Sequence, residues 1–408
     1  MLVAEVETLV IGAGASGLAA AAALVDSGTQ VVVLEARGRT GGRVWTDKGN
    51  VDLGAYGIGR VSRDEDDFDE VGPGASGTVT DEMDALFERM LSMKGCCPDK
   101  SVKDLFLAQE KPMDRWLFEM VDKAYIATDY AADATNLSSM FWLEDPGTGG
   151  YSFGEIMPGG YQQIFDNVMA EKKLDIRLNT VVQLITYANN SVTVKCVDGR
   201  EFRAKQVILT VPLGVLQHGS IQFNPQLSGE RMRAIEALSM GRLVKIYLEF
   251  PRGSLPMDPD TPGAYRIPSR GKQLHPLEPL YFLNLNSYNP SKNGILIEVG
   301  GERSIELEQM TDEQVGQFIF PYVQEAFPHV KGYSDIRVTR WGLDPFSYGA
   351  YSFQKVGMNA STRQVIGKAI GNWCFFAGEH LSKHPAYVHG AWDSGVAAAA
   401  ESIKNRRT

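Results

Sequence analysis

Cysteine and long apolar runs are scarce in this sequence of 408 residues. Its four cysteines are Cys96, Cys97, Cys196 and Cys374, and no CxxC pair occurs. Their number and spacing exclude a disulfide framework, a zinc ribbon and a dithiol redox site. The longest apolar run near the N-terminus, residues 18–25, is far shorter than the ~20 residues that cross a membrane. We therefore expect reduced thiols and no association with a membrane.

Targeting signals are also missing. The start, MLVAEVETLVIGAG, lacks the basic segment followed by an apolar segment that marks a signal peptide. The last residues, Asn405–Thr408, do not form the Ser-Lys-Leu signal for peroxisomes. We expect a cytoplasmic protein.

Positive charge is in deficit, with 40 Lys and Arg against 50 Asp and Glu and a net charge of −10. This balance argues against nucleic acids and anionic membranes as partners, and leaves cationic small molecules open as substrates. Residues 63–70, RDEDDFDE, concentrate acids ahead of the glycine-rich segment 71–77. This run is either a solvated, mobile loop or an acidic lip that attracts a cationic substrate.

The composition is globular, with 44% hydrophobic and 22% charged residues, and the length suggests two or three domains. The first forty residues are the most informative. Residues 6–11 form an apolar, β-branched run typical of a buried strand. The glycine-rich turn GAGASG at 12–17, the Ala-rich helix 18–26 and a second strand at 31–34 follow, and Glu35 ends that strand.

The spacing of this β-α-β unit is that of a dinucleotide-binding turn. Gly12 permits the tight turn, Gly14 lets the backbone approach a pyrophosphate, and Gly17 lets the helix pack on the strand. The pyrophosphate then lies at the helix N-terminus, where free N–H groups point outward. Glu35 is placed to accept hydrogen bonds from a ribose diol.

A second glycine turn distinguishes the cofactor. Residues 36–43 read ARGRTGGR, and VDLGA follows at 51–55. Additional N–H groups and a guanidinium near the phosphates are required by a dinucleotide longer than NAD. The rest of the chain predicts helices in 81–132, 312–327 and 388–404. Strand patterns lie at 181–185, 192–195, 206–211 and 243–250. We find no internal repeat.

Two separated stretches resemble one family. The first is GAGASGLAAAAAL…VVVLEARGRTGGR…VDLGA, and the second, more than 300 residues later, is FFAGEH…YVHGAWDSGVAAA. With VTVKCVDGREFRAKQVILTVPLGVL and MGRLVKIYLEF they look like the flavin-containing amine oxidases. This family includes monoamine and polyamine oxidases, L-amino-acid oxidases and lysine-specific histone demethylases. The YVHGA string is most similar to polyamine oxidases.

The resemblance implies an α/β fold with two interleaved domains. A Rossmann-type FAD-binding domain is expected over 1–60, 180–240 and 355–408. An α+β substrate-binding domain is expected over 61–179 and 241–354.

FAD is the cofactor that the resemblance implies. Ala350 stands where monoamine oxidases carry the cysteine that is linked to FAD, so we expect non-covalent binding. Gly378 and Glu379 precede a helix, where backbone N–H groups can face a flavin carbonyl. The cofactor-binding residues carried over by position are Gly12, Gly14, Ser16, Gly17, Glu35, Ala36, Arg37, Gly42, Arg43, Gly54, Ala55, Tyr56, Val182, Trp341, Gly378, Glu379 and Val388.

Three residues are candidates for catalysis. Lys245 matches the family lysine that holds a water near the flavin, and its alternative is an ordinary strand lysine that reaches solvent. Tyr351 and Tyr387 match the aromatic pair that flanks the substrate amine, and their alternative is a structural role in the core. His380 and His384 lie four residues apart, but without a third ligand we expect no metal site.

The resemblance implies oxidation of a polyamine or primary amine by hydride transfer from its α-carbon, with oxygen as acceptor and imine or aldehyde and hydrogen peroxide as products. L-Amino-acid oxidation, a flavin desaturase and a flavin-bound interaction scaffold are the alternatives. Arg60 is displaced from the position where L-amino-acid oxidases hold a substrate carboxylate. The sequence does not predict the oligomeric state.

Overall fold

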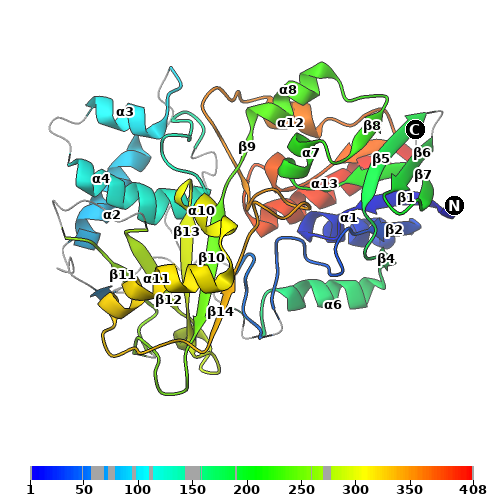
Figure 1. The fold of residues 1–408 in the computed structure, drawn as a ribbon. Coiled ribbons are helices and arrows are strands. Elements are labelled where there is room, and N and C mark those ends of the chain that lie inside the picture. Colours follow the sequence, from blue (N-terminus) through cyan, green and yellow to red (C-terminus); the bar gives the residue numbers. More distant parts are fainter. Residues whose placement is uncertain are drawn as a thin grey trace.

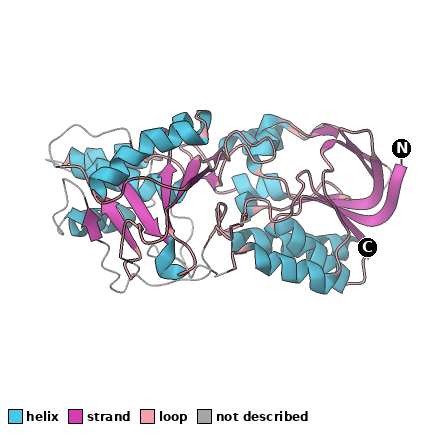
Figure 2. Cartoon of the chain, turned by 60° about the horizontal axis from the view of Figure 1, so that its bottom comes forward, coloured by secondary structure: helices cyan, strands magenta, loops and turns pink. Residues whose placement is uncertain are grey.

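Two lobes, each built on a β-sheet, make up the computed structural model (Figures 1 and 2). It describes residues 2–47, 49–56, 69–71, 79–93, 98–109, 114–142, 157, 159–188, 191–258, 260–269 and 277–406. Arg60, Cys96, Cys97 and most of the acidic run 63–70 lie outside these ranges, so the acidic-lip hypothesis stays a prediction.

The first sheet has the order β4-β2-β1-β7-β6-β5-β8, and β16 pairs with β7. Its centre is parallel: β1 pairs with β2 on one side and with β7 on the other. All four side chains of β2 are buried, as expected for a parallel strand covered on both faces. The strands are β1 (Leu2–Ile11), β2 (Val31–Leu34), β4 (Ile176–Arg177), β5 (Val182–Ala188), β6 (Ser191–Cys196), β7 (Glu201–Leu209), β8 (Gln222–Asn224) and β16 (Cys374–Phe376).

Helices from both ends of the chain cover this sheet. α1 (Ala15–Asp26) packs closely against α13 (Val388–Arg406), and a Cβ at Gly395 would lie 2.0 Å from the Ser16 carbonyl oxygen. In Figure 1 the blue and red ribbons therefore lie side by side. Residues far apart in sequence thus meet at the predicted dinucleotide turn.

One boundary differs from the expected division. The sequence predicts 61–179 in the substrate-binding domain, but α6 (Gln162–Lys172) packs beside α1, and β4 pairs with β2. Both therefore belong to the lobe of the first sheet (Figure 1). β4 has only two residues, too few to give an alternating pattern in the sequence.

The second sheet has the order β14-β10-β13-β12-β11-β3. Its strands are β3 (Asp69–Val71), β10 (Leu243–Glu249), β11 (Gly263–Arg266), β12 (Leu280–Asn284), β13 (Gly294–Gly300) and β14 (Asp335–Val338). Alternate residues of β10 enter different cores. Tyr247 packs with the helices of residues 79–130, whereas Ile246 and Leu248 pack with the helix Asp312–Ala326.

The helices of this lobe are α2 (Val79–Ser92), α3 (Val102–Gln109), α4 (Arg115–Val121), α5 (Ala127–Tyr130), α9 (Leu285–Tyr288), α10 (Arg303–Gln309) and α11 (Asp312–Ala326), and the π-helix η1 (Asp122–Ile126) joins α4 to α5. β9 (Ser239–Met240) and β15 (Ser352–Phe353) form a small ladder between the lobes. The remaining elements are α7 (Leu213–His218), α8 (Gly229–Ala237), α12 (Thr362–Gly367) and η2 (Glu379–Leu381). Among the described residues, no helix is both long enough and apolar enough to span a bilayer.

Candidate active site

A cavity of about 1090 Å³ lies between the two lobes. One end is formed by loops at the carboxyl ends of β1, β2 and β7, the usual ligand position in open α/β sheets. The other end is formed by α5, η1 and strands of the second sheet. Of the twenty predicted site residues, nineteen line this cavity, and Gly17 lies behind it.

The predicted dinucleotide turn has the required geometry. Gly12 has a φ of +105° and its N–H donates to the Leu34 carbonyl at 2.8 Å. A Cβ at Gly17 would lie 1.9 Å from the Gly12 carbonyl oxygen, so the helix approaches the strand more closely than a side chain permits. A Cβ at Gly14 would meet no atom closer than 3.8 Å. Gly14 therefore keeps a clear approach to the cavity.

The residues at this turn fit a pyrophosphate. Ser16 is buried, and its Oγ makes no hydrogen bond within the described part of the chain. The unpaired N–H groups at the start of α1 open into the same space. Gly42, at a φ of +61°, lies against Gly14 and completes the cradle.

Glu35 is almost fully buried, at 3% exposure. Its Oε2 accepts from the Ala13 N–H at 2.7 Å and its Oε1 accepts from the Arg37 N–H at 2.8 Å. Each oxygen retains a lone pair for a ribose hydroxyl. The Arg37 side chain pairs with Asp344 at 2.7 Å and lies 5.4 Å from the centre of the Phe346 ring. No local pattern in the sequence singles out Asp344 or Phe346, since their contacts with Arg37 cross about 300 residues.

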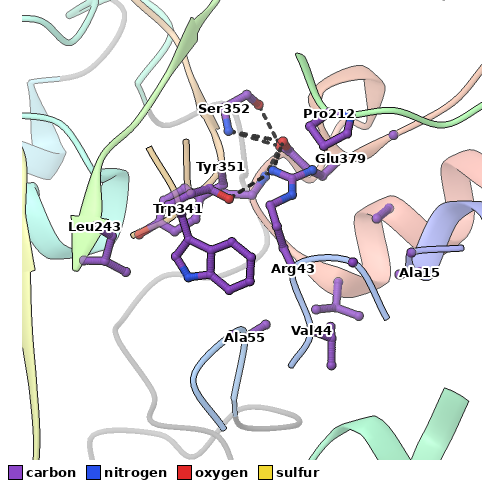
Figure 3. A pocket seen from close by; sticks show the side chains of 18 of the residues that line it. Ala15, Arg43, Val44, Ala55, Pro212, Leu243, Trp341, Tyr351, Ser352 and Glu379 are labelled. Atoms are coloured by element: carbon purple, nitrogen blue, oxygen red, sulfur yellow. Dashed lines mark hydrogen bonds and ion pairs between the residues drawn. The ribbon is translucent and has the colours of Figure 1, made fainter. Parts of the chain in front are cut away.

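Glu379 binds three segments together rather than facing the cavity alone (Figure 3). Arg43 donates to its Oε1 at 2.9 Å and to the Ala350 carbonyl at 3.0 Å. The Ser352 hydroxyl donates to Oε2 at 2.7 Å, and the Ala386 N–H donates to the same oxygen at 3.0 Å. This carboxylate therefore holds the second glycine turn, through Arg43, to the segments that carry Ser352 and Ala386.

Electrostatics keep Glu379 ionised. Burial raises its pKa, but Arg43, His380 and the bonds from Ser352 and Ala386 outweigh burial and lower the pKa from 4.5 to about 2. Burial lowers the pKa of the neighbouring His380 to about 4, so this imidazole is neutral at pH 7.

The depressed pKa of Glu379 predicts a pH-dependent contribution to stability. This contribution is complete above about pH 5 and is lost as the pH falls from 4.5 toward 2. In urea unfolding, the stability advantage of the wild type over Glu379→Gln should shrink by about 2 kcal/mol between pH 6 and pH 3. An advantage that stays constant with pH would show that Glu379 is not held as a buried anion.

Lys245 does not reach solvent. It is 4% exposed, and its Nζ donates to the Gly54 carbonyl at 2.6 Å. Glu298 Oε1 lies 3.3 Å from Nζ, and the centre of the Tyr56 ring lies 3.6 Å away. The pKa of Lys245 lies below its ordinary value, because the effect of burial exceeds the opposing effects of Glu298 and Asp52. A catalytic role for Lys245 stays a prediction.

Tyr351 and Tyr387 both line the cavity. The Tyr351 hydroxyl donates to the Thr128 carbonyl at 2.6 Å, which fixes the ring. Burial raises the pKa of Tyr351 well above 10, so the phenol stays neutral. Tyr387 is 42% exposed and stacks on His389 with ring centroids 5.1 Å apart. This exposure argues against a core role for Tyr387.

The walls of the second end of the cavity consist of residues that no sequence motif singles out. The Tyr265 ring lies tilted against Tyr281 and edge-on to Tyr125, with ring centroids 4.8 Å and 6.1 Å apart. Two carboxylates, Asp129 on α5 and Glu298 on β13, line the same end. Other residues there are Phe87, Leu91, Ala124, Thr128, Tyr130, Trp142 and Leu243.

Metal ligands are not grouped in the described ranges, where no set of three or more His, Cys, Asp or Glu side chains could hold an ion. His380 is buried, whereas His384 lines the cavity with its ring centroid 5.3 Å from that of His389.

Comparisons with known proteins agree with this geometry. The model of the flavin containing amine oxidoreductases matches residues 15–61 and 84–403. The chain is 32% identical to polyamine oxidase 2 of Arabidopsis thaliana, over 96% of this chain and 86% of that protein. It is 31% identical to human lysine-specific histone demethylase 2, over 96% of this chain but 53% of that protein.

A solved structure shares the fold. Putrescine oxidase with bound putrescine superposes with a TM-score of 0.78 over 99% of this chain and 100% of its own, at 19% identity. The predicted α/β fold with two domains is confirmed. FAD, the predicted cofactor, is supported by the family and by the fit of the turn. The chain therefore belongs to the flavin-containing amine oxidoreductase family, with FAD as its cofactor.

Proposed function

We propose that this protein oxidises a polyamine or primary amine with oxygen as the acceptor. FAD, which the residues of the two glycine turns would hold, would supply the redox chemistry for hydride removal from the α-carbon of the amine and for electron transfer to oxygen. The products are an imine, which water hydrolyses to the aldehyde, and hydrogen peroxide. Because Ala350 offers no thiol, we also propose that FAD is held without a covalent bond.

One observation carries this proposal: the cradle for FAD opens directly into a chamber with aromatic walls and two carboxylates. Tyrosine faces and the Asp129 carboxylate suit a cation with an aliphatic chain. Tyr351 is held from behind by the Thr128 carbonyl, so its ring can orient the amine without moving.

Oxidation of L-amino acids is disfavoured by the charges of the chamber. Among the described residues that line the cavity, the arginines are Arg37 and Arg43. Both lie at the cofactor end and are paired with Asp344 and Glu379. Within the described part of the chain, the substrate end therefore presents carboxylates and offers no guanidinium to a substrate carboxylate. The same acids disfavour the apolar substrates of flavin desaturases.

Peroxide release tests the function directly. We expect the purified protein to release peroxide in air with putrescine, spermidine or tyramine, and much less with L-leucine. Acid precipitation should leave the flavin in solution. A protein that releases no peroxide with any amine, although it contains stoichiometric flavin, would contradict the oxidase function and favour the scaffold alternative.

Asp129 offers a sharper test of specificity. We expect Asp129→Asn to raise the KM for spermidine roughly tenfold, the scale of one lost charge-assisted hydrogen bond. The KM for a monoamine should change less, since it has no second ammonium. Equal effects on both substrates would show that Asp129 does not bind a distal ammonium.

A further inference from the structure

The pairing of β10 with β13 places an acid opposite the candidate catalytic lysine. Lys245 and Glu298 are direct partners in this antiparallel ladder. Directly opposed residues project to the same face, with Cβ atoms about 5 Å apart. That face opens into the cavity, because both side chains line it.

The Lys245 ammonium is held from three directions. The Gly54 carbonyl accepts from it at 2.6 Å, Glu298 lies at 3.3 Å, and the Tyr56 ring lies at 3.6 Å. The Tyr56 hydroxyl donates to Glu298 Oε2 at 3.1 Å, which closes the cycle. Every one of these partners favours a cation over a neutral amine.

We propose that Glu298 is a positioning residue that holds Lys245 charged and fixed beside the Gly54 turn. Burial alone favours the neutral amine. The groups that oppose burial are Glu298 from β13 and Asp52 from the loop before Gly54. On the third side, the loop after β14 contributes only the uncharged Thr339, which accepts from the Lys245 N–H at 2.8 Å.

The charge matters for the reaction with oxygen. Negative charge develops on oxygen as it accepts electrons, and a fixed cation in a buried site stabilises that charge more than water does. A neutral lysine would provide no such stabilisation. The link to oxygen rests on the proposed function, but the protonation of Lys245 by itself does not.

The first experiment follows Lys245 without any turnover. In the holoenzyme labelled with ¹³C at lysine Cε, the Lys245 resonance is identified by its loss in Lys245→Met, and its NMR shift is followed against pH. We expect Glu298→Gln to move its titration midpoint to lower pH by about one unit or more. Glu278→Gln is the matched control, because Glu278 forms another buried pair, with Arg266, away from the cavity. It should leave the midpoint unchanged.

The second experiment measures reoxidation of dithionite-reduced enzyme by oxygen, which requires no amine. We expect the reoxidation rate to fall as the pH rises. The midpoint of this decline should lie at a lower pH in Glu298→Gln than in the wild type. At low pH, where Lys245 is protonated in both proteins, the two reoxidation rates should agree. A structural defect would lower the rate of Glu298→Gln at every pH. An unmoved midpoint with a raised KM for amines would overturn the proposal and make Glu298 a substrate anchor. If Glu298→Gln shifts the titration midpoint of Lys245 but the wild type oxidises no amine, only the oxidase function is refuted.

Discussion

Gly17→Ala should abolish retention of FAD and strongly destabilise the protein. The new Cβ would lie 1.9 Å from the Gly12 carbonyl oxygen and 2.9 Å from its carbon, both of which are backbone atoms that no rotamer change can move. Overpacking of side chains costs about 1–3 kcal/mol, and a clash with the backbone should reach the upper end of this range. Because the displaced turn is the pyrophosphate cradle, the Kd for FAD should rise at least about a hundredfold.

Gly332→Ala is the matched control, because a Cβ there meets nothing within 4 Å. Flavin per chain after gel filtration and the Tm report the two effects separately. A Gly17→Ala protein that keeps stoichiometric FAD would show either that the turn tolerates a side chain or that FAD binds elsewhere.

Lys245→Met should slow the oxygen reaction of the reduced enzyme by about 10²–10³-fold, the scale of one lost electrostatic contact in a buried site. The substitution also leaves the Glu298 charge buried without its partner. Breaking a buried pair in this way destabilises proteins by about 3–5 kcal/mol. A slow oxygen reaction in Lys245→Met alone therefore does not distinguish loss of the charge from loss of the folded structure.

The double variant Lys245→Met/Glu298→Gln separates these effects. Removing both charges should restore much of the stability while the oxygen reaction stays slow. Stopped-flow reoxidation and urea unfolding supply the two readouts. Recovery of the rate together with the stability would remove Lys245 from the chemistry.

Local sequence was sufficient for the first turn. Glycines at 12, 14 and 17, followed by Glu35 at the end of the second strand, predicted a tight turn and a close helix–strand approach, and the structure has both. The role of these residues in binding FAD stays a prediction. These contacts depend on the spacing within one β-α-β unit, so the sequence carries them directly. The sequence did not predict β4, because two residues are too few to show an alternating hydrophobic pattern. Its place in the first sheet is determined by its pairing with β2.

The second end of the cavity depends on contacts that no local pattern encodes. Glu298 meets Lys245 because two strands about fifty residues apart pair in one register. Asp129 lies in a helical stretch and is distinguished from other helical acids only by the cavity that it lines. Position within the family motif indicated Lys245, but its partners came from tertiary structure.

Anaerobic mixing with a polyamine tests the central claim most directly. Without oxygen, each bound FAD can accept electrons only once, so spermidine or putrescine should bleach the oxidised-flavin absorbance stoichiometrically, and admission of air should restore it. Loss of absorbance with these amines and not with L-leucine is the predicted result. A flavin that stays oxidised with every amine, although dithionite reduces it, would contradict amine oxidation at this site.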